Sequence, residues 1–206
     1  MKTIVRTAAL ALACLLATES ANAAVVLRNY KYFTLSGTTA ADLDRELSRR
    51  GPQLHKTGPR HPGATQMRFN TKVKYGSDGK SCRVVEANIT IHAQVHLPRW
   101  KQRASAKPDL AMIWDTLSAD IKRHEESHIV IARTAAGDME RAMKALPWRS
   151  NCEEMKADAA RLMVKLMKEQ DAAQIQFDRV EGKNFERRFE RLLIFRIQRE
   201  MEKKKG

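Results

Sequence analysis

The residues with the clearest chemical potential lie in the stretch Arg123-His124-Glu125-Glu126-Ser127-His128, which has the form H-E-x-x-H. On a helix, residues four apart share one face and are roughly 6 Å apart. His124 and His128 can therefore offer two imidazoles to one metal ion, and Glu125 can take a proton from a metal-activated water. The alternative is a pair of surface histidines on a charged helix face.

The apolar pattern around the motif favours the metal site. After Pro108, apolar residues recur in steps of three and four, and both histidines fall on the same stripe as Ile121 and Ile131. Histidines directed towards the core, with Glu125 beside that face, are what a buried metal site requires. Core histidines satisfied by hydrogen bonds are the other interpretation of this stripe.

The preceding segments must form the surface against which this helix packs. Strands are predicted over 25–35 and 66–75, and a short helix follows Thr38 or Thr39 and ends at 51–52. The clearest strand is 84–97, where apolar residues from Val85 to Leu97 alternate with a second set from Val84 to His96 that is polar from Glu86 onwards. Period two over this length predicts one buried face and one polar face.

The C-terminal third is expected to be helical. One helix is predicted from Glu153 to about Phe177 and, after a break at 178–184, a last stretch that is apolar on one side and Arg-rich on the other. Such a helix either lies on an anionic membrane surface or docks with a solvated basic face. The fold class is therefore α+β, with a small antiparallel sheet packed against the long H-E-x-x-H helix and C-terminal helices.

Four other histidines are weaker candidates for metal binding. His55 and His61 lie in a loop rich in Pro and Gly, where exposed histidines are common. His92 and His96 are on the polar face of the strand, roughly 13 Å apart, so they cannot both bind one ion. They are expected to be solvated or to face a substrate.

The N-terminus predicts export. Residues 1–23 combine a positive start, an apolar run from Thr7 to Ala17 and the cleavage pattern Ala21-Asn22-Ala23, as in a secretory signal peptide. No later segment is long and apolar enough to span a membrane. After cleavage Cys82 and Cys152 remain, and two cysteines in an exported domain predict one disulfide; free thiols or soft metal ligands are the alternative.

The net charge of the chain indicates which class of binding partner to expect. Without Lys2, Arg6 and Glu19 of the signal peptide, the 38 basic and 24 acidic residues become 36 and 23, a net charge of +13. This excess favours acidic partners, such as anionic lipid or an acidic envelope polymer, whereas export argues against nucleic acid.

An ordered set of motifs is similar to one bacterial family. In chain order, the motifs are Tyr32 with 35–38, Leu47 to 51–52, Cys82 before the alternating strand, Leu97-Pro98-Arg99-Trp100, Trp114 and the H-E-x-x-H. Over roughly residues 30–180 the chain resembles the DUF922 proteins, described as predicted secreted zinc-dependent proteases. The resemblance implies Zn²⁺ at His124 and His128, Glu125 as the base, and the layout of zincin-type peptidases.

The chain departs from this family near its end. Where members usually carry a His, a natural third ligand, this sequence has Lys183 in the segment 177–184, and a protonated lysine cannot bind zinc. The third ligand is then expected to be a carboxylate, Glu181 first and Asp178 as the alternative, or an upstream histidine. If none reaches the metal, the protein is an inactive relative.

Two functions follow from the sequence. The first is a periplasmic or secreted zinc metallopeptidase, with a signal peptide at 1–23, a peptidase domain at 24–183 and a basic amphipathic helix at 184–206. An extended peptide or protein substrate would add to the polar edge of strand 84–97. The second is a basic envelope-binding or interaction protein with a degenerate metal site.

Overall fold

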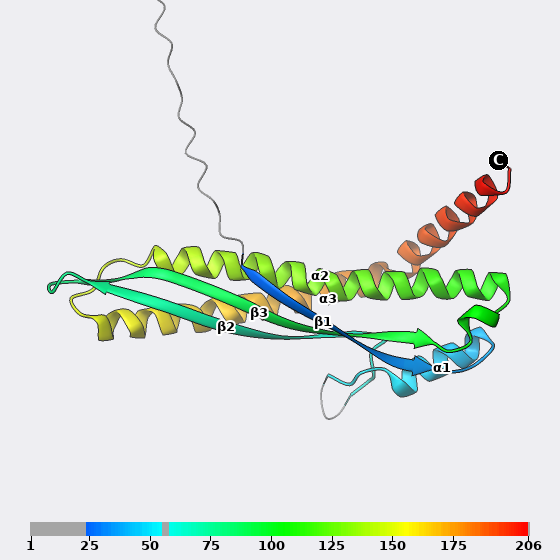
Figure 1. Cartoon of the computed structure of the whole chain (residues 1–206), viewed down its shortest axis with the longest axis horizontal. Coiled ribbons are helices and arrows are strands. Elements are labelled where there is room, and N and C mark those ends of the chain that lie inside the picture. Colours follow the sequence, from blue (N-terminus) through cyan, green and yellow to red (C-terminus); the bar gives the residue numbers. More distant parts are fainter. Residues whose placement is uncertain (1–23, 55–57, 206) are drawn as a thin grey trace, which may run out of the picture.

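The structure is a computed structural model that describes residues 24–54 and 58–205. The predicted signal peptide and His55 lie outside the described residues. Two long helices run along one side of a three-stranded sheet, and a short helix lies at the end of the first strand (Figure 1). In chain order the elements are β1 (Val25–Leu35), α1 (Ala40–Arg50), β2 (Ala64–Ser77), β3 (Cys82–Trp100), a 3₁₀ turn (Arg103–Ser105), α2 (Pro108–Lys144) and α3 (Cys152–Lys203).

The α+β class is confirmed, but the sheet is not fully antiparallel. Its order is β1-β3-β2, with β2 antiparallel to β3 and β1 parallel to β3. The chain leaves β1, passes through α1 and returns along β2, and the hairpin at 77–82 then places β3 between the two earlier strands. A strand inserted between two that run in opposite directions must be parallel to one of them.

The central position of β3 corrects the expected substrate edge. From Thr90 to His96 β3 is paired with β1 on one side and with β2 on the other, so it has no free edge there. Along this stretch the outer edges of the sheet belong to β1 and β2.

A β-bulge corrects the alternation at the start of β3. Lys74 pairs with Glu86 and Tyr75 with Val84, so Val85 is the extra residue. The bulge shifts the buried phase by one position. As a result Val84 is 4% exposed and Val85 46% exposed, the reverse of the prediction.

Helix α2 is continuous through Gly137 and buries a row at four-residue spacing, Ile121, Glu125 and Ile129. His124 and His128 are only partly buried, on the flank of this row. The expected order of burial is therefore reversed: Glu125 is the most buried of the three, and the histidines are turned towards α3. The reason is that α2 packs against the sheet and α3 at once.

Helix α3 extends unbroken over 52 residues, so the predicted break at 178–184 is wrong. A glycine inside a helix costs only about 1 kcal/mol relative to alanine. Two residues after Gly182, the side-chain amide of Asn184 donates to the Val180 carbonyl (2.9 Å). The boundary drawn between 183 and 184 falls inside this helix. Its last part still contacts α2, because Arg196 lies 3.6 Å from Asp115. This part carries five exposed large apolar residues: Leu192, Ile194, Phe195, Ile197 and Met201.

The predicted disulfide between Cys82 and Cys152 is confirmed, with the two Cα atoms 5.1 Å apart. It joins the first residue of β3 to the first residue of α3. A backbone pairing of Cys82 with Arg149 reinforces the same junction. Among the helices of residues 24–54 and 58–205, none carries an apolar stretch long enough to cross a bilayer.

Candidate metal centre

Three side chains from α2 and α3 converge on one point. His124 Nε2 and His128 Nε2 are 3.2 Å apart, and Asp178 Oδ1 is 3.1 Å from the first and 3.0 Å from the second. The three donor atoms thus form a nearly equilateral triangle. Within the described part of the chain, this is the group of metal-binding side chains that lies close enough to share an ion.

Both imidazole rings are held by α3. Phe177 stacks on the ring of His124, with centroids 4.9 Å apart, and meets the ring of His128 edge-on at 5.1 Å. Gln174 places Oε1 2.6 Å from His128 Nδ1 and donates from Nε2 to the His128 carbonyl. If Nδ1 carries the proton in this bond, the Nε2 lone pair faces Asp178, which is the arrangement a metal-binding histidine needs.

The electrostatics favour a neutral imidazole at His124. Burial lowers the pKa of His124, and the neighbouring His128 lowers it further, against the opposing effect of Asp178 and Glu181. The neutral ring is the form that donates a lone pair to a metal.

Glu125 lies against the sheet beside the histidines. It is 5% exposed, and burial raises the pKa of its carboxyl. The Thr65 hydroxyl is 2.9 Å from Oε2 and so fixes the carboxylate. Gly63 approaches so closely that an added Cβ would lie 2.8 Å from Oε1, so this position needs a glycine.

Glu181 has other partners than the donor triangle. It pairs with Arg123 and with Arg188 (3.3 Å), and lies 3.7 Å from Nδ1 of His124, the nitrogen on the other side of the ring. The sequence placed Glu181 first for the third position, with Asp178 as the alternative. The structure instead brings Asp178 to the two Nε2 atoms, so Glu181 is positioned to orient His124.

The upstream histidines are separated from the triangle. His61 lines the same cavity, but it is not among the converging side chains. His92 and His96 belong to the polar alternation of β3, on the face away from α2.

A cavity of about 510 Å³ opens beside the triangle. Its walls come from the chain around His61 to Thr65, from α2 and from α3, and its apolar lining includes Ile121 and Phe185. This volume is within the range of small-ligand sites, roughly 300–1,000 Å³.

Sequence reasoning missed a charge cluster at one end of this cavity. The carboxylate of Asp120, 4% exposed, accepts from Arg123 (2.8 Å) and from Arg188 Nε (3.1 Å). Burial opposes ionisation, but the two guanidinium groups outweigh it and hold the pKa of Asp120 below its ordinary value. Gln174 was missed too, although its spacing of four residues from Asp178 mirrors that of the two histidines.

Residues 30–185 match the family described as "Bacterial protein of unknown function (DUF922)". The chain belongs to the DUF922 family. The match begins at Tyr30, within β1, and ends at Phe185, within α3. It contains His124, His128 and Asp178. No curated protein and no solved structure matches the chain.

Helix α3 shows where Lys183 lies, at the position where the resemblance led us to expect a histidine. In this DUF922 chain Lys183 is exposed, and the period of 3.6 residues places it off the helix face that carries Gln174, Asp178 and Glu181. A side chain at 183 would thus point away from the triangle, whereas Asp178 points into it.

Proposed function

We propose that this protein is an exported zinc-dependent peptidase in which His124, His128 and Asp178 hold the metal and Glu125 is the general base. The supporting observation is the triangle of two imidazole nitrogens and one carboxylate oxygen with sides of 3.0, 3.1 and 3.2 Å. It is combined with a buried carboxylate on the same helix, one residue after the first histidine.

The donor set fits zinc in type and in spacing. Catalytic zinc sites use three N or O ligands and leave a fourth position open, with bonds of roughly 2.0–2.2 Å. Corners of a tetrahedron of that size are about 3.3–3.6 Å apart, and the sides of this triangle come close to that. The exposed side of Asp178 leaves the site open to the cavity.

Zinc in this position would supply Lewis acidity to the scissile carbonyl and to a water molecule. Glu125 takes the proton of the attacking water and passes it to the departing amine nitrogen. The burial of Glu125 raises its pKa and makes it a better base at neutral pH. Thr65 holds the carboxylate in one orientation throughout.

We place the substrate along β2 rather than along β3. Thr65 and Met67 of β2 line the cavity, and the outer edge of β2 is unpaired within the sheet. An extended peptide added to this edge would lie next to Glu125.

Export rests on the confirmed disulfide, which is typical of an oxidising compartment, and on the predicted signal peptide. The alternative, an envelope-binding protein with a degenerate site, is favoured by the exposed apolar residues on the Arg-rich end of α3. Such a surface is typical of helices that rest on anionic membranes.

Zinc content and peptide cleavage test the proposal. The purified protein is expected to contain one zinc and to cleave an unstructured peptide, whereas Glu125→Gln keeps the zinc and loses activity by at least about a hundredfold. Glu126→Gln is the matched control, because it changes the adjacent carboxylate and is expected to leave activity within a few-fold. The proposal would be rejected if the protein retained no zinc after incubation with the metal, or if Glu125→Gln were as active as the native chain.

A further inference from the structure

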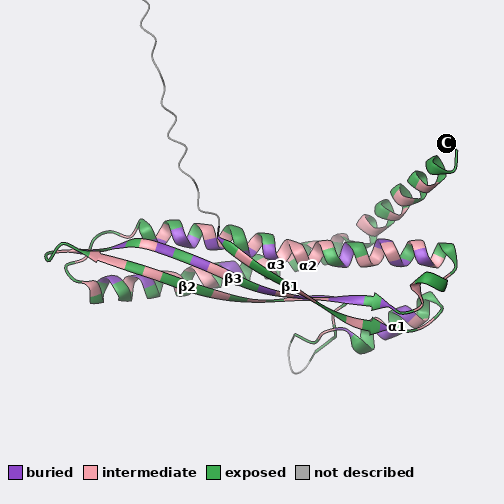
Figure 2. Cartoon of the chain, viewed as in Figure 1, coloured by how far each residue is buried: buried purple, intermediate pink, exposed green. Residues whose placement is uncertain are grey.

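The face of the sheet that points away from α2 and α3 is open. In Figure 2 β1 is mostly exposed, and exposed residues alternate with intermediate ones along β2. The orientation of this outward face is fixed by Tyr30, which points the other way and donates to Glu126 of α2 (2.5 Å). The outward face therefore carries the alternate residues of each strand: Val25, Leu27, Asn29 and Lys31 of β1; Gln66, Arg68, Asn70, Lys72 and Lys74 of β2; and Glu86, Asn88, Thr90, His92, Gln94 and His96 of β3.

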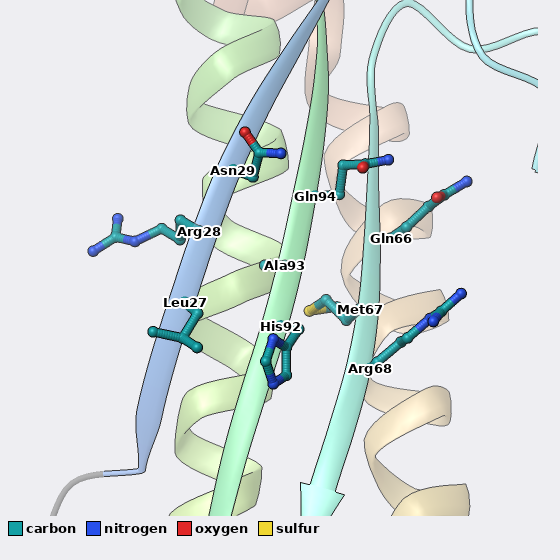
Figure 3. Close-up of a pocket in the computed structure, with 9 residues that line it drawn as sticks. All are labelled: Leu27, Arg28, Asn29, Gln66, Met67, Arg68, His92, Ala93 and Gln94. Atoms are coloured by element: carbon teal, nitrogen blue, oxygen red, sulfur yellow. The ribbon is translucent and has the colours of Figure 1, made fainter.

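Side-chain amides form a row across this face. In register, Gln94 of β3 is opposite Asn29 on one side and Gln66 on the other, so three amides lie side by side (Figure 3). The next row along the strands is Leu27, His92 and Arg68. A hollow of about 630 Å³ lies over these two rows.

Cations continue along β2 from Arg68, which lines the hollow, to Lys72 beyond it. Arg68 and Lys72 are four residues apart and so roughly 13 Å apart along the strand. Within 24–54 and 58–205, no carboxylate lies at ion-pair distance from Lys31, Arg68 or Lys72. The acid on this face, Glu86, pairs with Lys74 (2.5 Å), which leaves three uncompensated cations.

The composition of the face decides between occupants. A second copy of the same face would bring like charges together. Phe33 and Trp100 share the phase of the outward residues, but both pack into the cluster of Leu43 and Trp114 at the end of the sheet. The outward residues given above include no ring on which single-stranded nucleic acid could stack. Amides that donate and accept, with arginine and lysine beside them, match sugar hydroxyls and carboxylates.

We propose that the outward face binds a linear acidic polysaccharide. Its carboxylates would contact Arg68 and Lys72, and its hydroxyl groups would bond to the row of Asn29, Gln94 and Gln66. The roughly 13 Å between the two cations requires a polymer with repeated charges, because one small anion cannot reach both. The metal triangle lies on the helix side, so this binding does not depend on the proposed peptidase activity.

The test is titration of the purified chain with polygalacturonate. Binding is expected to weaken steeply with salt and to fall about tenfold or more with the methyl-esterified polymer, which keeps the sugar backbone without the charge. The double variant Arg68→Ala/Lys72→Ala is expected to lose about tenfold or more in affinity. The control Arg187→Ala/Arg191→Ala removes the same charge from exposed positions of α3 and should change affinity less than about twofold.

The amide row has its own readout. Asn29→Ala/Gln66→Ala is expected to weaken polygalacturonate about tenfold and to leave polyglutamate binding unchanged, because the polypeptide has no hydroxyls. His124→Ala should bind the polymer like the native chain. Equal binding of the methyl ester, equal losses in the two charge variants, or tighter binding of duplex DNA that depends on Arg68 and Lys72 would each overturn the proposal.

Discussion

At the scale of residues, Asp178 and Glu181 are one turn apart on α3 but have different partners. Asp178 meets the two Nε2 atoms, whereas Glu181 is held by Arg123 and Arg188. We therefore expect Asp178→Ala to abolish stoichiometric zinc binding. Glu181→Ala should keep the metal with an affinity lower by about ten- to a hundredfold, as is usual when a partner that orients a ligand is lost.

Competition with a chromophoric chelator measures both affinities. Asp171→Ala is the control, because it removes an exposed aspartate of the same helix and should bind zinc like the native protein. A larger loss of zinc affinity in Glu181→Ala than in Asp178→Ala would identify Glu181 as the third metal ligand.

At the scale of elements, the continuity of α3 can be measured at Gly182. An added Cβ there would meet nothing within 4 Å, and the residue is inside the helix. We expect Gly182→Ala to raise the free energy of unfolding by about 1 kcal/mol, the difference in helix propensity. Urea denaturation provides the measurement. A loop at 178–184, as the sequence indicated, would give no such gain.

The contact between α2 and α3 depends on Asp120 and Arg188. Removing one partner of a buried ion pair costs about 3–5 kcal/mol, so Asp120→Asn should destabilise the protein by about 3 kcal/mol at pH 7. The folded pKa of Asp120 is depressed, so its stabilising effect is complete above the unfolded pKa, about 3.9. It is lost as the pH falls through the folded pKa.

Unfolding of the native and Asp120→Asn proteins in urea at several pH values checks this sign. The difference between the two should be constant near neutrality and shrink below about pH 4. A difference that grows on acidification would contradict the assignment of an ionised Asp120 paired with Arg188.

At the scale of the whole molecule, the disulfide closes a loop of 70 residues that contains β3 and α2. On the chain-entropy relation such a loop is worth about 4 kcal/mol. We expect Cys82→Ser/Cys152→Ser to lower the free energy of unfolding by about that amount. Reduction of the native protein should reproduce the shift, whereas reduction of the double variant should have no effect.

Periodicity and local chemistry sufficed for the elements other than α3. The strands, a threonine cap of α1 at Thr38 or Thr39, the long α2 and the disulfide were predicted, because each depends on a local pattern or on the count of cysteines; the cap is Thr39. Strand order was not, since nothing local indicates that β3 enters between β1 and β2. The bulge at Val85 was missed for the same reason, because two adjacent valines look alike until the partner strand is known.

The candidate site divides in a similar way. His124, Glu125 and His128 follow from one helix and its spacing. Asp178, Gln174 and Phe177 reach them from a second helix 46 or more residues away along the chain, and the expected break at 178–184 hid their common face. The family match at 30–185 confirms the resemblance found from the motifs, and activity stays a prediction.

The origin of the triangle in two helices has a kinetic consequence. Both histidines are on α2 and the carboxylate is on α3, so the three donors meet only while the helices are docked. A bound ion could leave only through partial ligation or through separation of the helices, and local openings of this kind are governed by their own free energies. The rate at which the metal is released to an excess of chelator would then report how often α3 separates from α2. A global melting curve does not detect such local openings.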